Sequence, residues 1–359
     1  MNNGSFDVDV WNNEYARRYI LSTVLQSLYL VLGVCGNLTA IIIYTTKMHS
    51  KHDDRYFIPF LASVDLSGCV VSTSLILIEN NLPYKYPNTA ICKFLNVTAC
   101  GLIVGSIFLL LVISIQRYQK ICRPFHYQMN LRCKRIVASL VLCLAVAFAF
   151  PTIFLYEKVE VVHPSTNVTG HRCGPVPNTE AFGEIYRGIV IAAELISVVG
   201  MSVLYGFVGY TLVTKMKPTK KANPNEMPIS SQTTNMEKTT EDTNVSESVD
   251  TSMDSRFHEK DGKALKRKKE NIKYRTGKQY SLMFMSISLV SILCFFPPWI
   301  FVLLETKDKT FWNHLSYEQT QIFVIIRGIF VLNFVVNPFI YCFFDSKFKH
   351  NVYKYLTCK

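Results

Sequence analysis

The stretch FLNVTACGLIVGSIFLLLVISIQ (94–116) contains no charged residue and is dominated by Leu, Ile, Val and Phe. A hydrocarbon core about 30 Å thick is crossed by roughly 20 apolar residues in helical form. Lipid offers no partners to backbone N–H and C=O groups, so such a run must be helical. Six further runs qualify or come close, and none alternates with a period of two residues, which excludes a β-barrel. They lie near 19–45, 56–80, 136–156, 185–213, 280–304 and 320–344. The sequence therefore predicts an all-α membrane protein, a seven-transmembrane helix bundle.

The composition of the 359-residue chain supports this prediction. It is 49% hydrophobic and 18% charged, whereas ordinary globular chains have about 25% charged residues. This excludes a disordered protein, a collagen, a small disulfide scaffold and most cytosolic enzymes. The first residues are polar and acidic, with no basic start before an apolar stretch, so we expect no cleavable signal peptide.

Charge predicts the orientation. Most of the 38 Lys and Arg residues fall in the tail and loops on the C-terminal side of the predicted spans. Because positive residues stay in the cytoplasm, we expect an extracellular N-terminus and a cytoplasmic C-terminus at the plasma membrane. The net charge of +12 reflects mainly this asymmetry. The basic run 263–275 resembles a nucleic-acid patch, but here it favours membrane lipid or a cytosolic partner, and we expect no nucleic-acid ligand.

Cysteines and glycosylation sequons follow the same topology. Of eleven Cys, Cys92 and Cys173 alone fall on the extracellular side, which predicts one disulfide between the top of the third span and the 157–184 loop. Asn3 and Asn167 lie in sequons on the same side and are the expected glycosylation sites.

Several polar residues lie at bilayer depth. Ionisable groups there are costly and usually functional, and Asp65 lies midway along the second span. Neutral polar side chains around it would form a cage that suits a monovalent cation with water. The alternative is that they only hydrogen-bond the helices to one another. The proposed cage comprises Asn37, Asp65, Ser106, Asn333 and Asn337.

Five motifs in order on the predicted spans carry a family resemblance. They are Gly36-Asn37, LASVD (61–65), Cys92 preceding Gln116-Arg117-Tyr118, CFFPP (294–298) and NPFIY (337–341). Together they resemble the rhodopsin-like (class A) G-protein-coupled receptors, and most of all the neuropeptide receptors. The resemblance implies a receptor, not an enzyme, that activates heterotrimeric G proteins when a ligand binds. It also implies that Asp65, Ser106, Asn333 and Asn337 match the family's sodium pocket, with sodium as an allosteric ligand and no required cofactor.

The activation switch departs from the family pattern. Gln116 stands where the family has an acidic residue beside the arginine. The side chain of Arg117 is therefore expected to be held only weakly in its resting conformation, and signalling without ligand is expected to be raised. Phe295 replaces the usual Trp of the sixth span, and Pro297 is expected to kink this span as a pivot or as a packing feature. By resemblance, the switch also includes Tyr118, Tyr210, Pro338 and Tyr341, and the G-protein contact is formed by Arg117, Pro124 and Phe125.

The ligand is expected to be an extracellular peptide. Ala99 occupies the position of the aspartate in monoamine receptors, which argues against an amine. Charges of both signs, at Glu79, Glu194, Glu305 and Arg327, are instead predicted near the extracellular rim, with Trp299 among them. They suit a peptide, although Arg327 could equally pair with Glu79 or Glu194. The alternating run Lys158–Val162 predicts a hairpin over the pocket. The alternative interpretations are that the chain is a receptor for a non-amine small molecule or lipid, or that it is a transporter or channel.

The chain is divided into an extracellular tail (1–18), a receptor domain (19–345) and a cytoplasmic segment (346–359). Phe344, Phe348, Val352 and Leu356 recur every four residues, which predicts a short amphipathic eighth helix on the inner leaflet. Cys358 beside it is either a palmitoylation site or a free thiol. The third cytoplasmic loop (214–278) is rich in Ser, Thr and Glu, so we expect it to be largely disordered. Its hydroxyls favour phosphorylation by receptor kinases and arrestin binding there.

Overall fold

The computed structural model describes residues 7–48, 55–214, 251–307 and 311–357, and for 251–274 it describes the backbone alone. Within these ranges, seven helices are long and apolar enough to cross a membrane. The predicted seven-helix membrane bundle is thus confirmed, and the chain is a multi-pass membrane protein. The spans run over Ile20–Lys47, Phe57–Asn81, Thr89–Cys122, Leu131–Leu155, Glu180–Thr214, Arg275–Glu305 and Tyr317–Phe344.

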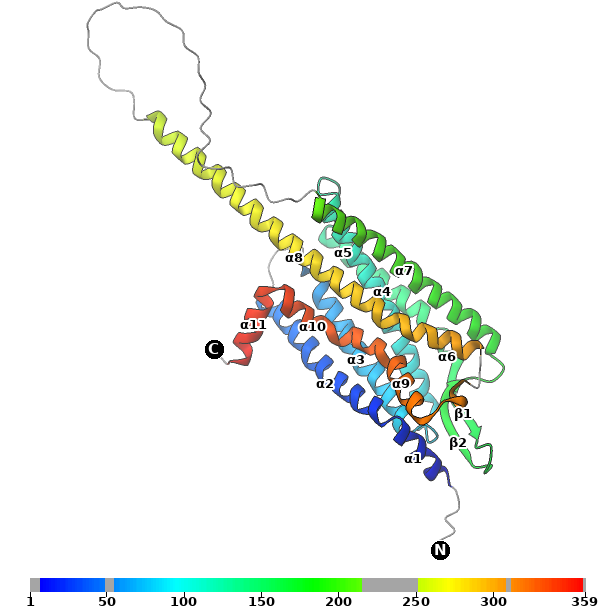
Figure 1. Ribbon diagram of the computed structural model, residues 1–359. Coiled ribbons are helices and arrows are strands. Elements are labelled where there is room, and N and C mark those ends of the chain that lie inside the picture. Colours follow the sequence, from blue (N-terminus) through cyan, green and yellow to red (C-terminus); the bar gives the residue numbers. More distant parts are fainter. Residues whose placement is uncertain (1–6, 49–54, 215–250, 308–310, 358–359) are drawn as a thin grey trace, which may run out of the picture.

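The helices and strands follow one another with short connections wherever the chain is described (Figure 1). In order they are α1 (Val8–Arg18), α2 (Ile20–Ile42), the π-helical turn η1 (Ile43–Lys47), α3 (Phe57–Asn81), α4 (Thr89–Cys122), α5 (Leu131–Ala149), α6 (Thr152–Leu155), β1 (Tyr156–Val162), β2 (Thr169–Pro175), α7 (Glu180–Thr214), α8 (Thr251–Lys307), the 3-10 turn η3 (Phe311–His314), α9 (Tyr317–Arg327), the 3-10 turn η4 (Gly328–Val331), α10 (Leu332–Phe344) and α11 (Ser346–Leu356).

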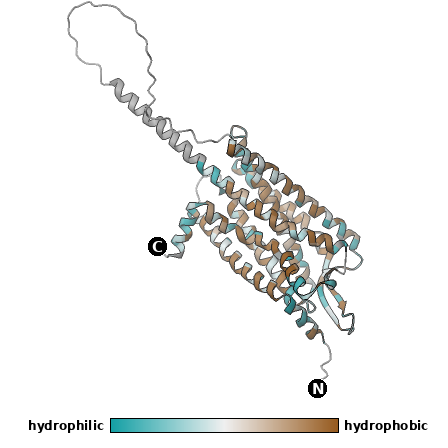
Figure 2. Cartoon of the chain, in the orientation of Figure 1, coloured by the Kyte–Doolittle hydropathy of each residue, from teal (hydrophilic) through white to brown (hydrophobic). Residues whose placement is uncertain are grey.

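Apolar side chains cover the outside of the bundle. Leu142, Ile196 and Leu293 are each more than 60% exposed on different helices. Figure 2 shows hydrophobic colour along the spans and hydrophilic colour gathered at the two ends of the bundle. In water such a surface would be unfavourable, whereas in lipid it costs nothing. This pattern fits a bundle that is surrounded by hydrocarbon.

Two glycines allow the helices to approach closely at the centre. A Cβ atom on Gly68 of α3 would lie 2.8 Å from the Phe334 ring of α10. A Cβ atom on Gly33 of α2 would lie 2.3 Å from the Cys69 sulfur of α3. Small residues at such crossings are typical of membrane bundles, where close packing replaces the hydrophobic effect. These contacts bring α2, α3 and α10 together around the polar residues described below.

The N-terminus and the C-terminus lie at opposite ends of the bundle (Figure 1), which we call the N-terminal face and the C-terminal face. At the N-terminal face, β1 and β2 form an antiparallel hairpin, as the alternating run predicts. A disulfide joins Cys92 of α4 to Cys173 of β2, with a Cα–Cα distance of 5.6 Å. The predicted disulfide and the predicted hairpin are both confirmed.

The N-terminal segment forms a helix, α1, that the sequence analysis treated only as a tail. Trp11 is 3% exposed and stacks on Tyr84, with ring centroids 3.7 Å apart. The side-chain amide of Asn12 donates to the Asn81 carbonyl at 3.0 Å. These contacts fix α1 against the end of α3 and the connection that follows it.

The predicted disorder of 214–278 is wrong for its second part. Helix α8 begins at Thr251 and continues without interruption into the sixth span. The run 263–275 has no apolar stripe, but its Lys, Arg, Glu and Leu residues are good helix formers. The helix therefore extends beyond the sixth span into a charged segment, which hydropathy alone would predict to be a loop. Residues 215–250, Asn3 and Cys358 lie outside the described residues, and with them the predictions made there.

Candidate functional site

The polar residues at mid-membrane form one buried cluster, as the sequence predicts. Asn37, Asp65, Ser106, Asn333 and Asn337 each have a fractional exposure of zero. The Asn337 amide donates to Asp65 Oδ2 at 2.7 Å, and the Asn333 amide donates to Ser106 Oγ at 3.5 Å. The Ser291 hydroxyl of α8 donates to Asn333 Oδ1. The cluster thus connects four spans through neutral hydrogen-bonding groups around one carboxyl group.

Asn37 is oriented differently from the others. Its amide donates to the Phe334 carbonyl at 2.7 Å and to the Gly33 carbonyl at 3.0 Å. It therefore ties α2 to α10 through the backbone. Asn37 thus has the role that the alternative interpretation assigns to all five polar residues, namely to hydrogen-bond one helix to another.

The donor set around Asp65 fits a small hard cation. Asp65 Oδ1 and Asn337 Oδ1 are buried and accept no hydrogen bond from any described residue. Buried acceptors without partners are rare, because each lost hydrogen bond costs free energy. One carboxylate with neutral oxygens is the donor chemistry that suits sodium with water. The residues present therefore fit the ion that the sequence analysis expected.

Arg117 is enclosed at the C-terminal face and is only 1% exposed. The side-chain oxygen of Gln116 accepts from Arg117 Nη2 at 3.3 Å. The guanidinium carbon lies 5.1 Å from the centroid of the Phe284 ring of α8. A protein partner cannot contact a side chain buried to this degree, so the bundle is closed at the C-terminal face.

Tyr210, which is predicted to turn inward and support Arg117, points away from the core in this closed arrangement, and its role stays a prediction. Tyr210 is 65% exposed, whereas Tyr205 is 6% exposed and its hydroxyl lies within electrostatic range of Arg117. Residues five apart point about 140° away from each other around a helix. The span has no proline to fix its register in the sequence, so the rotation of α7 becomes visible only in the structure.

The other switch residues lie where the sequence places them. Phe295 is 3% exposed in the core, and Tyr341 is fully buried. Helix α8 runs through Pro297, and Pro338 packs against Gly36. Tyr118 lies under the Arg123 guanidinium, 5.8 Å from its carbon. The proposed G-protein contact residues Pro124 and Phe125 are both exposed, and Phe125 completely so.

A second buried polar group lies at the C-terminal face and was not predicted from the sequence. Asp345, between α10 and α11, is 4% exposed. Its Oδ2 accepts from the Tyr280 hydroxyl of α8 at 2.8 Å and from the Tyr44 hydroxyl of η1 at 3.1 Å. Arg55, just before α3, lies 3.4 Å from the same oxygen and also donates to the Tyr280 hydroxyl. We call Tyr44, Arg55, Tyr280 and Asp345 the Asp345 cluster.

Asp345 has a further structural role in this cluster. Its Oδ1 accepts from the backbone N–H groups of Lys347 at 3.0 Å and Phe348 at 3.2 Å, which caps α11. The only sequence signal was an acidic residue immediately before an amphipathic run. Its partners are distant in sequence, so no local pattern could have predicted the cluster.

Charged and aromatic side chains gather at the N-terminal face. The indole N–H of Trp299 donates to Glu194 Oε2 at 2.7 Å. Arg327 Nε lies 3.7 Å from Glu305 Oε1, which also accepts from the Trp312 indole at 2.8 Å. The sequence analysis considered pairs of Arg327 with Glu79 or Glu194. The observed ion pair is instead with Glu305, because α8 and α9 lie side by side and bring these two residues together.

Glu79 and Tyr156 lie near this ion pair. Glu79 is half-buried and within electrostatic range of Arg327, and it forms no ion pair with any other described side chain. Burial raises the pKa of Tyr156 at the start of β1, and the positive charges of Arg187 and Arg327 oppose this rise. Tyr156 therefore remains a neutral hydroxyl near pH 7. Ala99 is buried at 5% exposure and offers no charge to an amine.

Comparison with known proteins agrees with this geometry. The family model described as 7 transmembrane receptor (rhodopsin family) matches residues 36–341. The cholecystokinin receptor of Xenopus laevis is 25% identical over 354 residues, which covers 91% of this chain and 74% of that receptor. The neuropeptide S receptor of Homo sapiens is 24% identical over 322 residues, which covers 88% and 74%. The tachykinin-like peptides receptor 99D of Drosophila melanogaster is 26% identical over 205 residues, which covers 54% and 38%.

The family match spans most of the chain, and its motifs lie at the positions where the structure builds the polar cluster and the closed C-terminal face. The resemblance inferred from the sequence is confirmed, and the function is that of a receptor, not of an enzyme. The chain belongs to the rhodopsin family of seven-transmembrane receptors, that is, to the G-protein-coupled receptors.

Proposed function

We propose that this receptor lies in the plasma membrane with its N-terminal face outside the cell and binds an extracellular peptide there. Three features support this orientation: the excess of Lys and Arg on the C-terminal side, the disulfide at the N-terminal face and the exposed sequon at Asn167. Peptide binding then opens the C-terminal face, so that a heterotrimeric G protein reaches Arg117.

The single observation that carries the peptide proposal is the mixed charge of the N-terminal face. Glu79 offers a carboxylate without an ion-pair partner among the described residues. Arg327 has a side chain that is 54% exposed although it lies near Glu305. A ligand with a cationic group and a carboxylate or amide could satisfy both. The two well-covered relatives and the Drosophila protein are named as receptors for peptides or neuropeptides, which agrees with this choice.

The experiment is nucleotide exchange on purified Gα subunits with the receptor in nanodiscs, screened against secreted peptides, including amidated ones. Once a peptide activates, its potency is measured on Glu79→Gln and Arg327→Gln. We expect a loss of about tenfold or more for each, because a charge pair in the bound complex is broken. Glu160→Gln, which removes an exposed carboxylate from β1 at the same face, is the matched control. Activation by a lipid or an uncharged small molecule, with no peptide effect, would refute the peptide proposal.

We also propose that sodium binds beside Asp65 and stabilises the closed bundle. The partnerless oxygens of Asp65 and Asn337, whose side chains are hydrogen-bonded to each other, support this. The test compares the melting temperature of the ligand-free receptor in sodium chloride and in choline chloride. We expect sodium to raise the melting temperature of the wild type and not that of Asp65→Asn. An equal effect of both salts on the wild type would overturn the proposal.

Regulation through the third cytoplasmic loop completes the proposed function. The 230–255 segment is rich in Ser and Thr interspersed with acidic residues, whereas the tail after α10 offers only Ser346 and Thr357. We assign receptor-kinase phosphorylation and arrestin binding to this loop. Basic residues on α11 are assigned to contact with the inner leaflet.

A further inference from the structure

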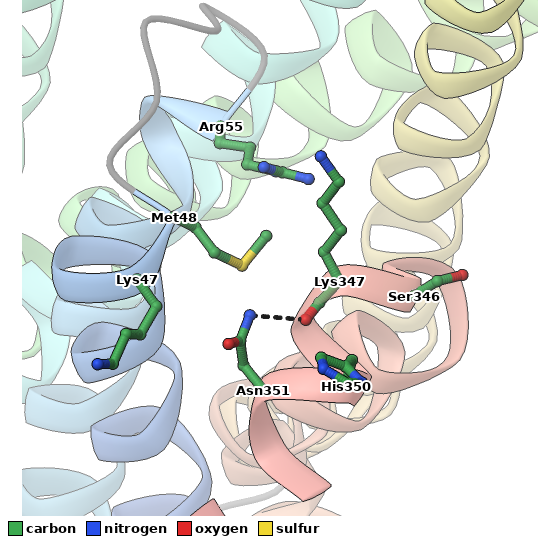
Figure 3. A pocket seen from close by; sticks show the side chains of 7 residues that line it. All are labelled: Lys47, Met48, Arg55, Ser346, Lys347, His350 and Asn351. Carbon is green, nitrogen blue, oxygen red and sulfur yellow. Dashed lines mark hydrogen bonds between the residues drawn. The ribbon is translucent and has the colours of Figure 1, made fainter. Parts of the chain in front are cut away.

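A cavity of about 450 Å³ lies at the C-terminal face, between the foot of α2 and α11. Figure 3 shows Arg55, Met48 and Lys347 reaching into this space from different elements. The lining residues are Lys47, Met48, Arg55, Ser346, Lys347, His350 and Asn351. None of the lining residues that the structure describes is acidic, and this composition indicates a site for an anion.

Among the side chains that the structure describes, the positive charge of the cavity is only partly neutralised. Lys47 and Lys347 form no ion pair with any described side chain, and both are exposed. Arg55 is engaged by Asp345 at 3.4 Å, and its side chain is 12% exposed. His350 also lines the cavity. Positive groups held around one cavity repel one another, which costs free energy. An anion bound in the cavity would attract each of them, so the electrostatic energy would become favourable.

The position and size of the cavity narrow the choice of anion. Lys47 ends the first span and Arg55 lies two residues before the second, so the cavity is at the boundary between hydrocarbon and water. One water molecule takes about 30 Å³ of liquid volume, so the cavity exceeds the size of a single small ion several-fold. Several cations from three elements match a headgroup that carries several phosphates better than one that carries a single negative charge.

We propose that this cavity, lined by Lys47, Arg55, Lys347 and His350, binds the phosphorylated inositol headgroup of an anionic membrane lipid. The proposal uses the cytoplasmic placement of the C-terminal face proposed above, since phosphates of this class are presented by the inner leaflet. Binding itself can be measured in a nanodisc, where both faces are accessible. Failure of the peptide or orientation proposal would therefore leave this test intact.

The test uses the full-length receptor in phosphatidylcholine nanodiscs that contain either phosphatidylinositol bisphosphate or phosphatidylserine at equal total charge. Native mass spectrometry counts the retained lipids, and soluble inositol trisphosphate or inorganic phosphate is added as competitor. The variant is Lys47→Gln with Lys347→Gln. The matched control is Lys349→Gln with Lys354→Gln, which removes the same charge from exposed positions on α11 that do not line the cavity.

We expect selective retention of phosphatidylinositol bisphosphate by the wild type and the control, with competition by inositol trisphosphate but not by equal inorganic phosphate. Each lysine near a charged headgroup contributes about fivefold in affinity, so the cavity variant should bind about 30-fold more weakly. If the control variant lost as much lipid binding as the cavity variant, or if phosphatidylserine were retained equally, general surface charge would explain the binding. Either result would overturn the proposed headgroup site. Equal competition by inorganic phosphate would identify a free phosphate site, and displacement by a phosphopeptide without lipid retention would identify a protein partner; either result overturns the lipid proposal.

Discussion

The Asp345 cluster is expected to hold the lower half of α8 in the closed position, and Tyr280→Phe tests this with the loss of one oxygen atom. The Tyr280 hydroxyl donates to Asp345 at 2.8 Å and accepts from Arg55. It is the hydroxyl through which this cluster reaches α8. The substitution keeps the aromatic ring and its packing, so the change in free energy reports on the hydrogen bonds.

The magnitude follows from the charge and burial of the acceptor. A hydrogen bond to a charged group contributes about 1.5–3 kcal/mol. Asp345 retains Tyr44, Arg55 and two backbone donors, so we expect the lower end of this range. A shift of about 1.5 kcal/mol changes the ratio of open to closed receptor about tenfold. While the open state remains a minority, ligand-free signalling should rise by nearly the same factor.

The assay is ligand-free nucleotide exchange on purified Gα subunits at matched amounts of receptor in nanodiscs. Tyr44→Phe is the matched control, because it removes a hydroxyl from the same carboxylate oxygen but from η1 instead of α8. We expect Tyr44→Phe to lower the melting temperature without raising basal exchange. Basal exchange of Tyr280→Phe equal to wild type, or an equal rise in Tyr44→Phe, would refute the assignment of the Asp345 cluster as a restraint on α8.

Three further predictions test other parts of the molecule. Gln116→Glu should lower ligand-free nucleotide exchange, because a carboxylate beside Arg117 holds the guanidinium more strongly than an amide does; unchanged exchange at equal surface expression would contradict this. Gly68→Ala should destabilise the receptor by about 1–3 kcal/mol, measured as a lower melting temperature, because its Cβ would lie 2.8 Å from Phe334, whereas Gly206→Ala, with no neighbour within 4 Å, should not. Deletion of 230–255 should abolish arrestin recruitment after activation, measured by a proximity assay in cells, and normal recruitment would place arrestin binding elsewhere.

The sequence could predict those features whose physics is local or set by the bilayer. The spans follow from the length of apolar runs, and the Cys92–Cys173 disulfide follows from topology and redox environment. Asp65 and its neighbours were found because charge at bilayer depth is costly. Each of these signals is strong in a single stretch of chain, so no knowledge of tertiary contacts was needed.

The features that were missed depend on contacts between distant segments. Helix α1 is polar and short, and Trp11 becomes buried because Tyr84 and His163 pack against it. The burial of Tyr205 was not predicted, because only the rotation of α7 in the bundle decides which of its tyrosines faces the core. The Asp345 cluster joins residues from four separate parts of the chain, and each of these residues alone looks like an ordinary polar group near the end of a predicted span.

If the Asp345 cluster restrains α8 as predicted, it adds to the contacts of Arg117 in keeping the C-terminal face closed. Gln116 and Arg117 are neighbours on the same helix, so their hydrogen bond cannot connect α4 to α8. Tyr280, by contrast, connects α8 to the junction of α10 and α11 through a carboxylate that is almost fully buried. Arg55 belongs to this cluster and also lines the basic cavity. A lipid phosphate bound in that cavity would compete with Asp345 for the Arg55 guanidinium. The proposed lipid site would then link the amount of anionic lipid to the closure of α8 through this one side chain.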